Sequence, residues 1–260
     1  MSSYTPTASI LIEKFKALPT ATQTRQKLLL VSQAHAPGLP SIPGTEREVR
    51  AVKAEMNASG FEALHLQEGD ATVDRVGEEM KTHSWIHLAC HGNQGNTNPL
   101  QSAFHLRDGK LGLLEIIKQR LDKAEFAFLS ACQTSTGAYF LSEETVHLAA
   151  GMLVAGYRSV VGTLWSIKDS HAPMVAGDFY RYLLDGTIDG EQRRSLDCRQ
   201  TAYALSYATQ GFRRAFTERA EAAAKEPLGP GESEALRKRK RLLAVEEALL
   251  AWVPYVHFGV

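Results

Sequence analysis

Apolar residues follow two alternating patterns along the chain. Short continuous apolar runs are typical of strands that are buried on both faces, and they alternate with stretches of helical periodicity. The runs cover residues 27–33, 61–66, 84–90, 125–131 and 159–166, and the helical stretches between them cover residues 45–58, 71–82, 111–123 and 143–157. Strands that alternate with helices predict parallel β-α-β units, and therefore an α/β fold with a mostly parallel central sheet.

The rest of the chain predicts further elements around this sheet. Helices are predicted over residues 173–184, 196–216 and 232–252, and the terminal VPYVHFGV, residues 253–260, has the character of a strand. Residues 217–235 are small, charged and interrupted by Pro and Gly, which indicates a surface insertion. With a predicted N-terminal helical extension over residues 1–25, the pattern indicates one domain over residues 26–260.

Composition and charge restrict the possible partners. Lys and Arg together number 29, as do Asp and Glu, so no overall charge favours nucleic acid or an acidic membrane. The basic run Arg237–Arg241 has glutamates nearby, and a solvated helix face explains it better than a nucleic-acid patch. The sequence has no apolar stretch of transmembrane length and only 3 cysteines, which predicts a cytoplasmic protein with reduced thiols.

Two of the predicted strands end at reactive side chains. Ile86–Gly92 reads IHLACHG and Ala127–Thr134 reads AFLSACQT. The carboxyl ends of parallel strands share one edge of a sheet, so we expect His91 and Cys132 to meet there. An imidazole can draw the proton from a nearby thiol, and the N–H groups of Gly92 and Cys132 could hold an oxyanion.

Structural roles are the alternative for the neighbouring residues. If the strand continues, Cys90 points to the opposite side from His91, so we interpret Cys90 as a core residue. We interpret His87, which lies on the same strand, as a core residue as well. A zinc site built from His87, Cys90, His91 and Cys132 lacks the usual ligand spacings, so no metal is expected.

The order of motifs resembles a known family. WIHLACHG, FAFLSACQTSTG, HLAAGMLVAGYRSVVGTLWSIKD, FYRYLL and PYVHFGV are similar to the CHAT domain, over about residues 27–260. This family belongs to the clan of caspases, separases and gingipains. The resemblance implies a caspase-haemoglobinase-like three-layer α/β/α sandwich. It also implies a cysteine endopeptidase in which Cys132 is the nucleophile and His91 the catalytic histidine, acting on a protein or peptide through a thioester without a cofactor.

The same resemblance suggests further site residues and partners. Ser130 and Gln133 flank the nucleophile and are expected near the substrate, and Trp165 and Asp169 follow the fifth strand, where clan members line the groove. Asp169 either meets a basic substrate side chain or caps the next helix. Family members often carry upstream helical repeats, so a separate sensor or regulatory partner is expected here. The alternative function is a catalytically silent, caspase-like interaction module.

Overall fold

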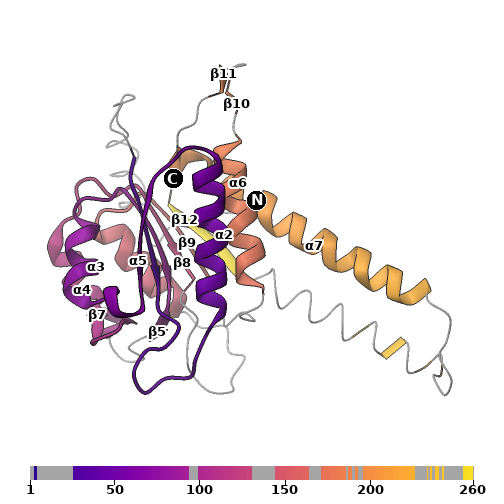
Figure 1. The fold of residues 1–260 in the computed structure, drawn as a ribbon, viewed down its shortest axis with the longest axis horizontal. Coiled ribbons are helices and arrows are strands. Elements are labelled where there is room, and N and C mark those ends of the chain that lie inside the picture. Colours follow the sequence, from indigo (N-terminus) through magenta and orange to yellow (C-terminus); the bar gives the residue numbers. More distant parts are fainter. Residues whose placement is uncertain are drawn as a thin grey trace.

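The computed structural model describes residues 3–4, 26–93, 99–130, 144–163, 171–185, 187–188, 191–192, 196–225, 233, 235, 238–239, 242 and 254–259. Within these residues seven of the strands form one sheet in the order β1-β12-β9-β8-β4-β2-β3 (Figure 1). Their bounds are β1 Ser3–Tyr4, β2 Leu28–Ser32, β3 Ala63–Gln67, β4 Trp85–Ala89, β8 Phe126–Leu129, β9 Ser159–Thr163 and β12 Tyr255–Gly259. From β9 to β3 all neighbours are parallel, whereas β12 is antiparallel to β9. The predicted mostly parallel sheet is confirmed.

Helices cover both faces of the sheet and form the two outer layers of the sandwich (Figure 1). One apolar cluster joins the strands to α2 (Gly44–Ala58), α6 (Ala172–Leu184) and α7 (Thr201–Lys225). The other joins them to α3 (Val73–Met80), α4 (Leu113–Gln119) and α5 (Glu144–Ala155). In β2, Leu28 and Leu30 belong to the first cluster and Leu29 and Val31 to the second, so successive side chains enter opposite cores.

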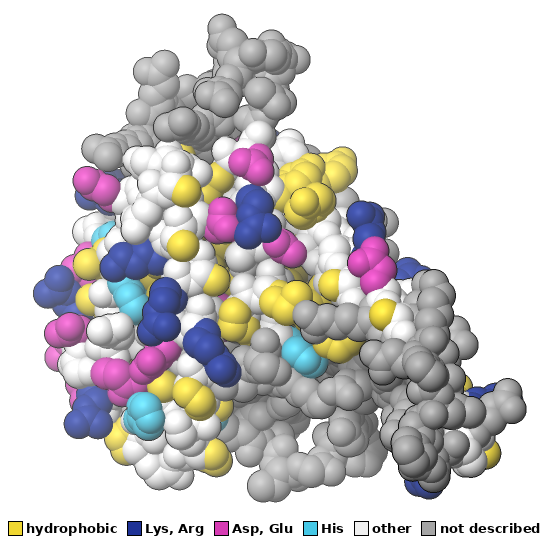
Figure 2. All heavy atoms as spheres, turned by 45° about the vertical axis from the view of Figure 1, so that its right-hand side comes forward, with side chains coloured by type: hydrophobic (Ala, Val, Ile, Leu, Met, Phe, Trp, Pro, Cys, Tyr) yellow, Lys and Arg dark blue, Asp and Glu magenta, His cyan; other side chains and the backbone are white. Residues whose placement is uncertain are grey.

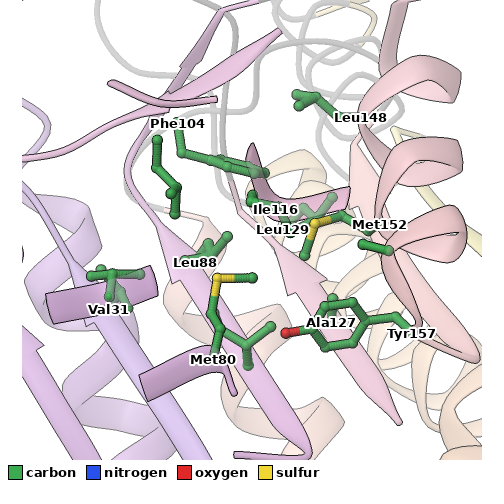
Figure 3. Packing of buried hydrophobic residues seen from close by; sticks show 14 of the residues in the cluster. Val31, Met80, Leu88, Phe104, Ile116, Ala127, Leu129, Leu148, Met152 and Tyr157 are labelled. Carbon is green, nitrogen blue, oxygen red and sulfur yellow. The ribbon is translucent and has the colours of Figure 1, made fainter. Parts of the chain in front are cut away.

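The second cluster shows why small residues occupy one face of α5. Figure 3 shows Leu88 and Leu129 from the sheet beside Met152 and Tyr157 from the α5 region. A Cβ added to Gly151 would lie 2.3 Å from the Cδ2 of Leu113, so the glycine allows α5 to pack closely on α4. Burial raises the pKa of the Tyr157 hydroxyl, which therefore stays protonated inside the core.

A second, antiparallel sheet follows β4 directly and was not predicted. It consists of β5 (His91–Asn93), β6 (Ala103–His105) and β7 (Lys110–Gly112). Strands of three residues have too few positions to show an alternating pattern, which is why the sequence did not reveal them. As a result α4 begins at Leu113, because β7 occupies the start of the predicted helix.

The two ends of the chain differ in part from the expectation. Ser3–Tyr4 form a strand paired with His257 and Phe258 where a helix was predicted, because the edge of β12 offers backbone partners, and residues 5–25 lie outside the described part. Helix α7 runs on to Lys225, into the predicted insertion. Of the described residues of the predicted last helix, Ala235, Lys238, Arg239 and Leu242 are helical and Ser233 is not, and the terminal strand is confirmed as β12.

The surface carries charges of both signs. Figure 2 shows Lys and Arg interspersed with Asp and Glu on one face of the molecule, together with separate apolar side chains. Exposed large apolar residues include Tyr203 and Tyr207 on α7. In the part of the chain that the structure describes, none of the helices combines the length and apolar character needed to cross a bilayer.

A buried histidine in β12 should make folding sensitive to acid. His257 Nε2 lies 2.8 Å from the Ser159 hydroxyl and 3.1 Å from that of Thr201, and burial lowers the pKa of His257 to about 4. The unfolded chain would titrate near 6.5, so it binds more protons than the folded chain between these two values. We therefore expect the free energy of unfolding to fall by roughly 3 kcal/mol as the pH drops through this window.

Urea unfolding at a series of pH values measures this dependence. His257→Gln should show a clearly flatter profile below pH ~6.5, while His35→Gln, which changes an exposed histidine, should follow the unmodified chain. Equal slopes for all three proteins would contradict the assignment.

Candidate active site

The strands that precede the two reactive motifs are adjacent. β4 and β8 pair in parallel, with Leu88 opposite Leu129, and the Ser130 N–H donates to the Leu88 carbonyl at 2.9 Å. The shared edge expected for the two motifs is therefore present at the carboxyl ends of these strands. His91 and Gly92 follow β4 within the described residues, whereas Cys132, Gln133, Trp165 and Asp169 lie outside them.

His91 is buried and held by one ring nitrogen. It is 3% exposed, and its Nε2 lies 2.7 Å from the carbonyl oxygen of Pro40. A carbonyl only accepts hydrogen bonds, so Nε2 must carry the proton that is donated. Nδ1 is buried and has no hydrogen-bond partner among the described residues. In the neutral ring, Nδ1 is therefore an acceptor available for a donor at this edge.

The loop that supplies the Pro40 carbonyl is anchored at both ends. It follows β2, which neighbours β4, so it reaches the same edge of the sheet. The Ile42 N–H donates to the Ala34 carbonyl at 3.0 Å, and the Ala34 N–H donates to the Glu68 carboxylate at 2.9 Å. The sequence showed only a loop rich in Pro and Gly, and nothing in it marked Pro40 as the partner of His91.

The orientation of His91 is a testable consequence. ¹⁵N NMR of the imidazole region should show His91 as the Nε2-protonated tautomer when it is neutral, because the Pro40 carbonyl requires that proton. His91→Ala identifies the resonance by its loss. Detection of the Nδ1-protonated tautomer would mean that Pro40 does not orient this ring.

The small antiparallel sheet fixes the segment after the histidine. His91 pairs with His105 and Gly92 with Phe104, so both residues are strand members and not part of an open loop. Phe104 is fully buried in the second apolar cluster. The histidine and the following glycine are thus held between the main sheet and a packed hairpin.

Glu48 is a buried carboxylate of α2. Thr45 and Glu48 have the spacing of a capping box, but the Thr45 hydroxyl donates to the Ile42 carbonyl at 2.9 Å and Glu48 is 1% exposed. Its carboxylate accepts hydrogen bonds from Ser130, at 2.8 Å, and from His87, at 3.2 Å. Tertiary partners inside the fold have replaced the local cap. Ser130 is buried and directs its hydroxyl proton inward, and its predicted substrate contact stays a prediction.

Two described members of the four-residue zinc set lie on opposite faces of the sheet. Cys90 belongs to the apolar cluster beneath α3 and α5, which confirms its predicted core position. His87 is also buried as predicted, but it stacks on Phe128 at 4.7 Å and bonds Glu48 on the opposite face. These two side chains therefore point away from each other across the sheet.

One group of described residues has metal-ligand chemistry. The donor atoms of His35, Glu46 and Glu68 lie within 4.8 Å of one another. The Glu68 carboxylate already accepts hydrogen bonds from the Ala34 N–H and the Gln33 amide, and His35 is exposed. These bonds give Glu68 a structural role in anchoring the loop of Pro40, and we assign no ion to the group.

Comparisons with known proteins give a family match and a similar fold. The chain matches the family described as CHAT domain over residues 2–259. No curated protein matches it. Among solved structures, the Arg-specific cysteine proteinase gingipain R superposes with a TM-score of 0.55 at 11% identity, over 96% of this chain and 51% of that chain.

A second gingipain structure shows the same similarity. The complex of the Porphyromonas gingivalis RgpB pro- and mature domains gives a TM-score of 0.53 at 10% identity, again over 96% of this chain and 51% of that chain. The chain therefore spans about half the length of these proteinases. At such identity the likeness concerns the fold, which is that of caspase-like cysteine proteinases.

Proposed function

The chain belongs to the CHAT domain family, and from this premise we propose that it is a cysteine endopeptidase that cleaves protein substrates. The observation that carries the proposal is the state of His91. Its Nδ1 is a buried acceptor without a described partner, and His91 follows β4, the strand that pairs with β8. Cys132 is two residues after Ser130, and two residues of extended chain span at most about 7 Å.

In the proposed reaction, His91 and Cys132 act as a dyad. His91 accepts the thiol proton at Nδ1 while the Cys132 sulfur attacks the scissile carbonyl carbon. The tetrahedral intermediate collapses to a thioester, and His91 donates its proton to the departing amine. Water then attacks the thioester, with His91 as base, and releases the acid product and the free thiol. The Pro40 carbonyl holds the ring throughout and stabilises the imidazolium.

The oxyanion and the substrate require further groups. We propose that the N–H groups of Gly92 and Cys132 donate to the oxyanion, since removing one such donor typically costs roughly 3 kcal/mol of transition-state stabilisation. We further propose that Gln133, Trp165 and Asp169 line the substrate groove near Ser130. Gingipain R is Arg-specific, and a basic preference here would assign Asp169 to the substrate and not to a helix cap.

A peptide library tests the function. The full chain is incubated with a positional-scanning library, and Cys132 is labelled in parallel with an alkylating probe. The proposal predicts cleavage at defined sites and His91-dependent labelling of Cys132. Absence of both would favour the silent interaction module.

A further inference from the structure

A hydrogen-bonded network of buried polar side chains lies directly below the end of β8. The Ser130 hydroxyl donates to Glu48 Oε2 at 2.8 Å, and His87 Nε2 lies 3.2 Å from Glu48 Oε1. The Tyr180 hydroxyl lies 3.4 Å from His87 Nδ1. Ser130 directly follows β8, whereas Glu48, His87 and Tyr180 belong to α2, β4 and α6, and each of the four is at most 5% exposed.

The donors and acceptors of this network match. Burial and then the neighbouring Glu48 carboxylate raise the pKa of Tyr180, so its hydroxyl keeps its proton and can donate to His87 Nδ1. The opposite ring nitrogen of His87 then donates to Glu48, whose second oxygen accepts from Ser130. The His87 ring is also clamped, because it stacks on Phe128 at 4.7 Å with an interplanar angle of 13°.

Burial of a carboxylate within such a network costs free energy of desolvation. A buried carboxylate loses its hydration, and apolar side chains of similar volume often stabilise a core equally well or better. Stability alone therefore explains poorly why a charged group lies here. The location suggests another reason, because the network ties together the two strands that lead to His91 and Cys132, at the point where β8 ends.

We infer that Glu48, acting through Ser130, is a positioning residue that fixes the start of the nucleophile segment relative to His91. This inference rests on the proposed function. Glu48 touches neither the substrate nor the reacting atoms. Its carboxylate holds the Ser130 side chain, and Ser130 is the last described residue before Cys132.

Ser130→Ala tests the inference in the full chain, because it removes the link to Glu48 and keeps the backbone. The rate of Cys132 alkylation should fall at least about tenfold, as for a lost hydrogen bond to a charged group. In peptide cleavage the loss should appear in kcat, with KM nearly unchanged. Ser130→Thr keeps the hydroxyl and should restore both rates to within about threefold. Glu48→Leu removes both acceptor oxygens and should behave as Ser130→Ala does.

Ser159→Ala is the matched control. Ser159 is also fully buried and hydrogen-bonded, to Thr201 at 2.6 Å and His257 at 2.8 Å, but it begins β9 and is paired with Phe126, at the amino ends of the parallel strands. A purely structural role predicts similar effects of both alanine variants once their free energies of unfolding are matched, and that result would overturn the inference. So would an unchanged alkylation rate in Ser130→Ala.

Alkylation needs no substrate, so the two proposals fail separately. Slower alkylation of Ser130→Ala in a chain that cleaves no peptide would reject the peptidase and retain the positioning role. Cleavage that is unaffected by Ser130→Ala and Glu48→Leu would do the reverse.

Discussion

Replacement of Cys132 by alanine should abolish peptide cleavage. We expect kcat/KM to fall by roughly 10⁴-fold or more, because the nucleophile and the base act as a unit and removing one member eliminates the covalent route. The measurement is kcat/KM on the best library peptide, with mass spectrometry to confirm that alkylation at position 132 is lost. The free energy of unfolding should change little in this variant.

Cys198→Ala is the control for thiol chemistry. Burial first, and then the Glu125 and Asp197 carboxylates, raise the pKa of the Cys198 thiol to about 12. This thiol should therefore not be alkylated, and its replacement should leave the rate of peptide cleavage unchanged. Cleavage by Cys132→Ala at the rate of the unmodified chain would show that the nucleophile lies elsewhere or that the activity is a contaminant.

Replacement of His91 by alanine is the second large effect. General acid–base catalysis contributes about 10²–10⁴-fold, and we expect a loss of that size in kcat/KM. The alkylation rate of Cys132 near neutral pH should fall as well, since the thiolate loses its imidazole partner. His91→Asn keeps a polar side chain and should show the same loss, so the prediction remains testable if His91→Ala misfolds.

His83→Ala is the matched control for this variant. His83 is also a buried histidine and lies just before β4, at the end of that strand remote from His91, where its Nδ1 lies 2.8 Å from the Glu79 carbonyl. It should leave kcat/KM unchanged. Equal losses in His83→Ala and His91→Ala would indicate that both act through the stability of β4.

Hydrophobic patterning predicted the frame of the fold because burial on both faces leaves a direct trace in the sequence. Continuous apolar runs such as Leu28–Val31 are typical of strands that are covered on both faces, and these residues are buried. The expected meeting of the two motifs rests on the rule that parallel strands end at one edge, and the pairing of β4 with β8 fulfils its structural condition.

Long-range polar partners could not be predicted in the same way. Glu48 is three residues after a threonine at a helix start, and local rules favour a cap there. Its partners are 39 and 82 residues away, and only the folded chain brings them within reach. Pro40 was missed for the same reason, because a backbone carbonyl is available at every residue and its selection depends on how the loop is anchored.

The way His91 is held suits a catalytic base. The ring is fixed by the Pro40 carbonyl, and the residues that follow it are paired in a small sheet. A ring that is already fixed loses little conformational entropy when the reaction begins, so it needs little reorientation before a proton transfer. Nδ1 is the nitrogen that this arrangement leaves available.

The most direct test of the dyad is the distance between Cys132 Sγ and His91 Nδ1 in a crystal structure of the chain. The account predicts a separation of roughly 3–4 Å, with the Pro40 carbonyl still bound to Nε2. A sulfur buried in either apolar cluster, more than about 7 Å from Nδ1, would contradict it.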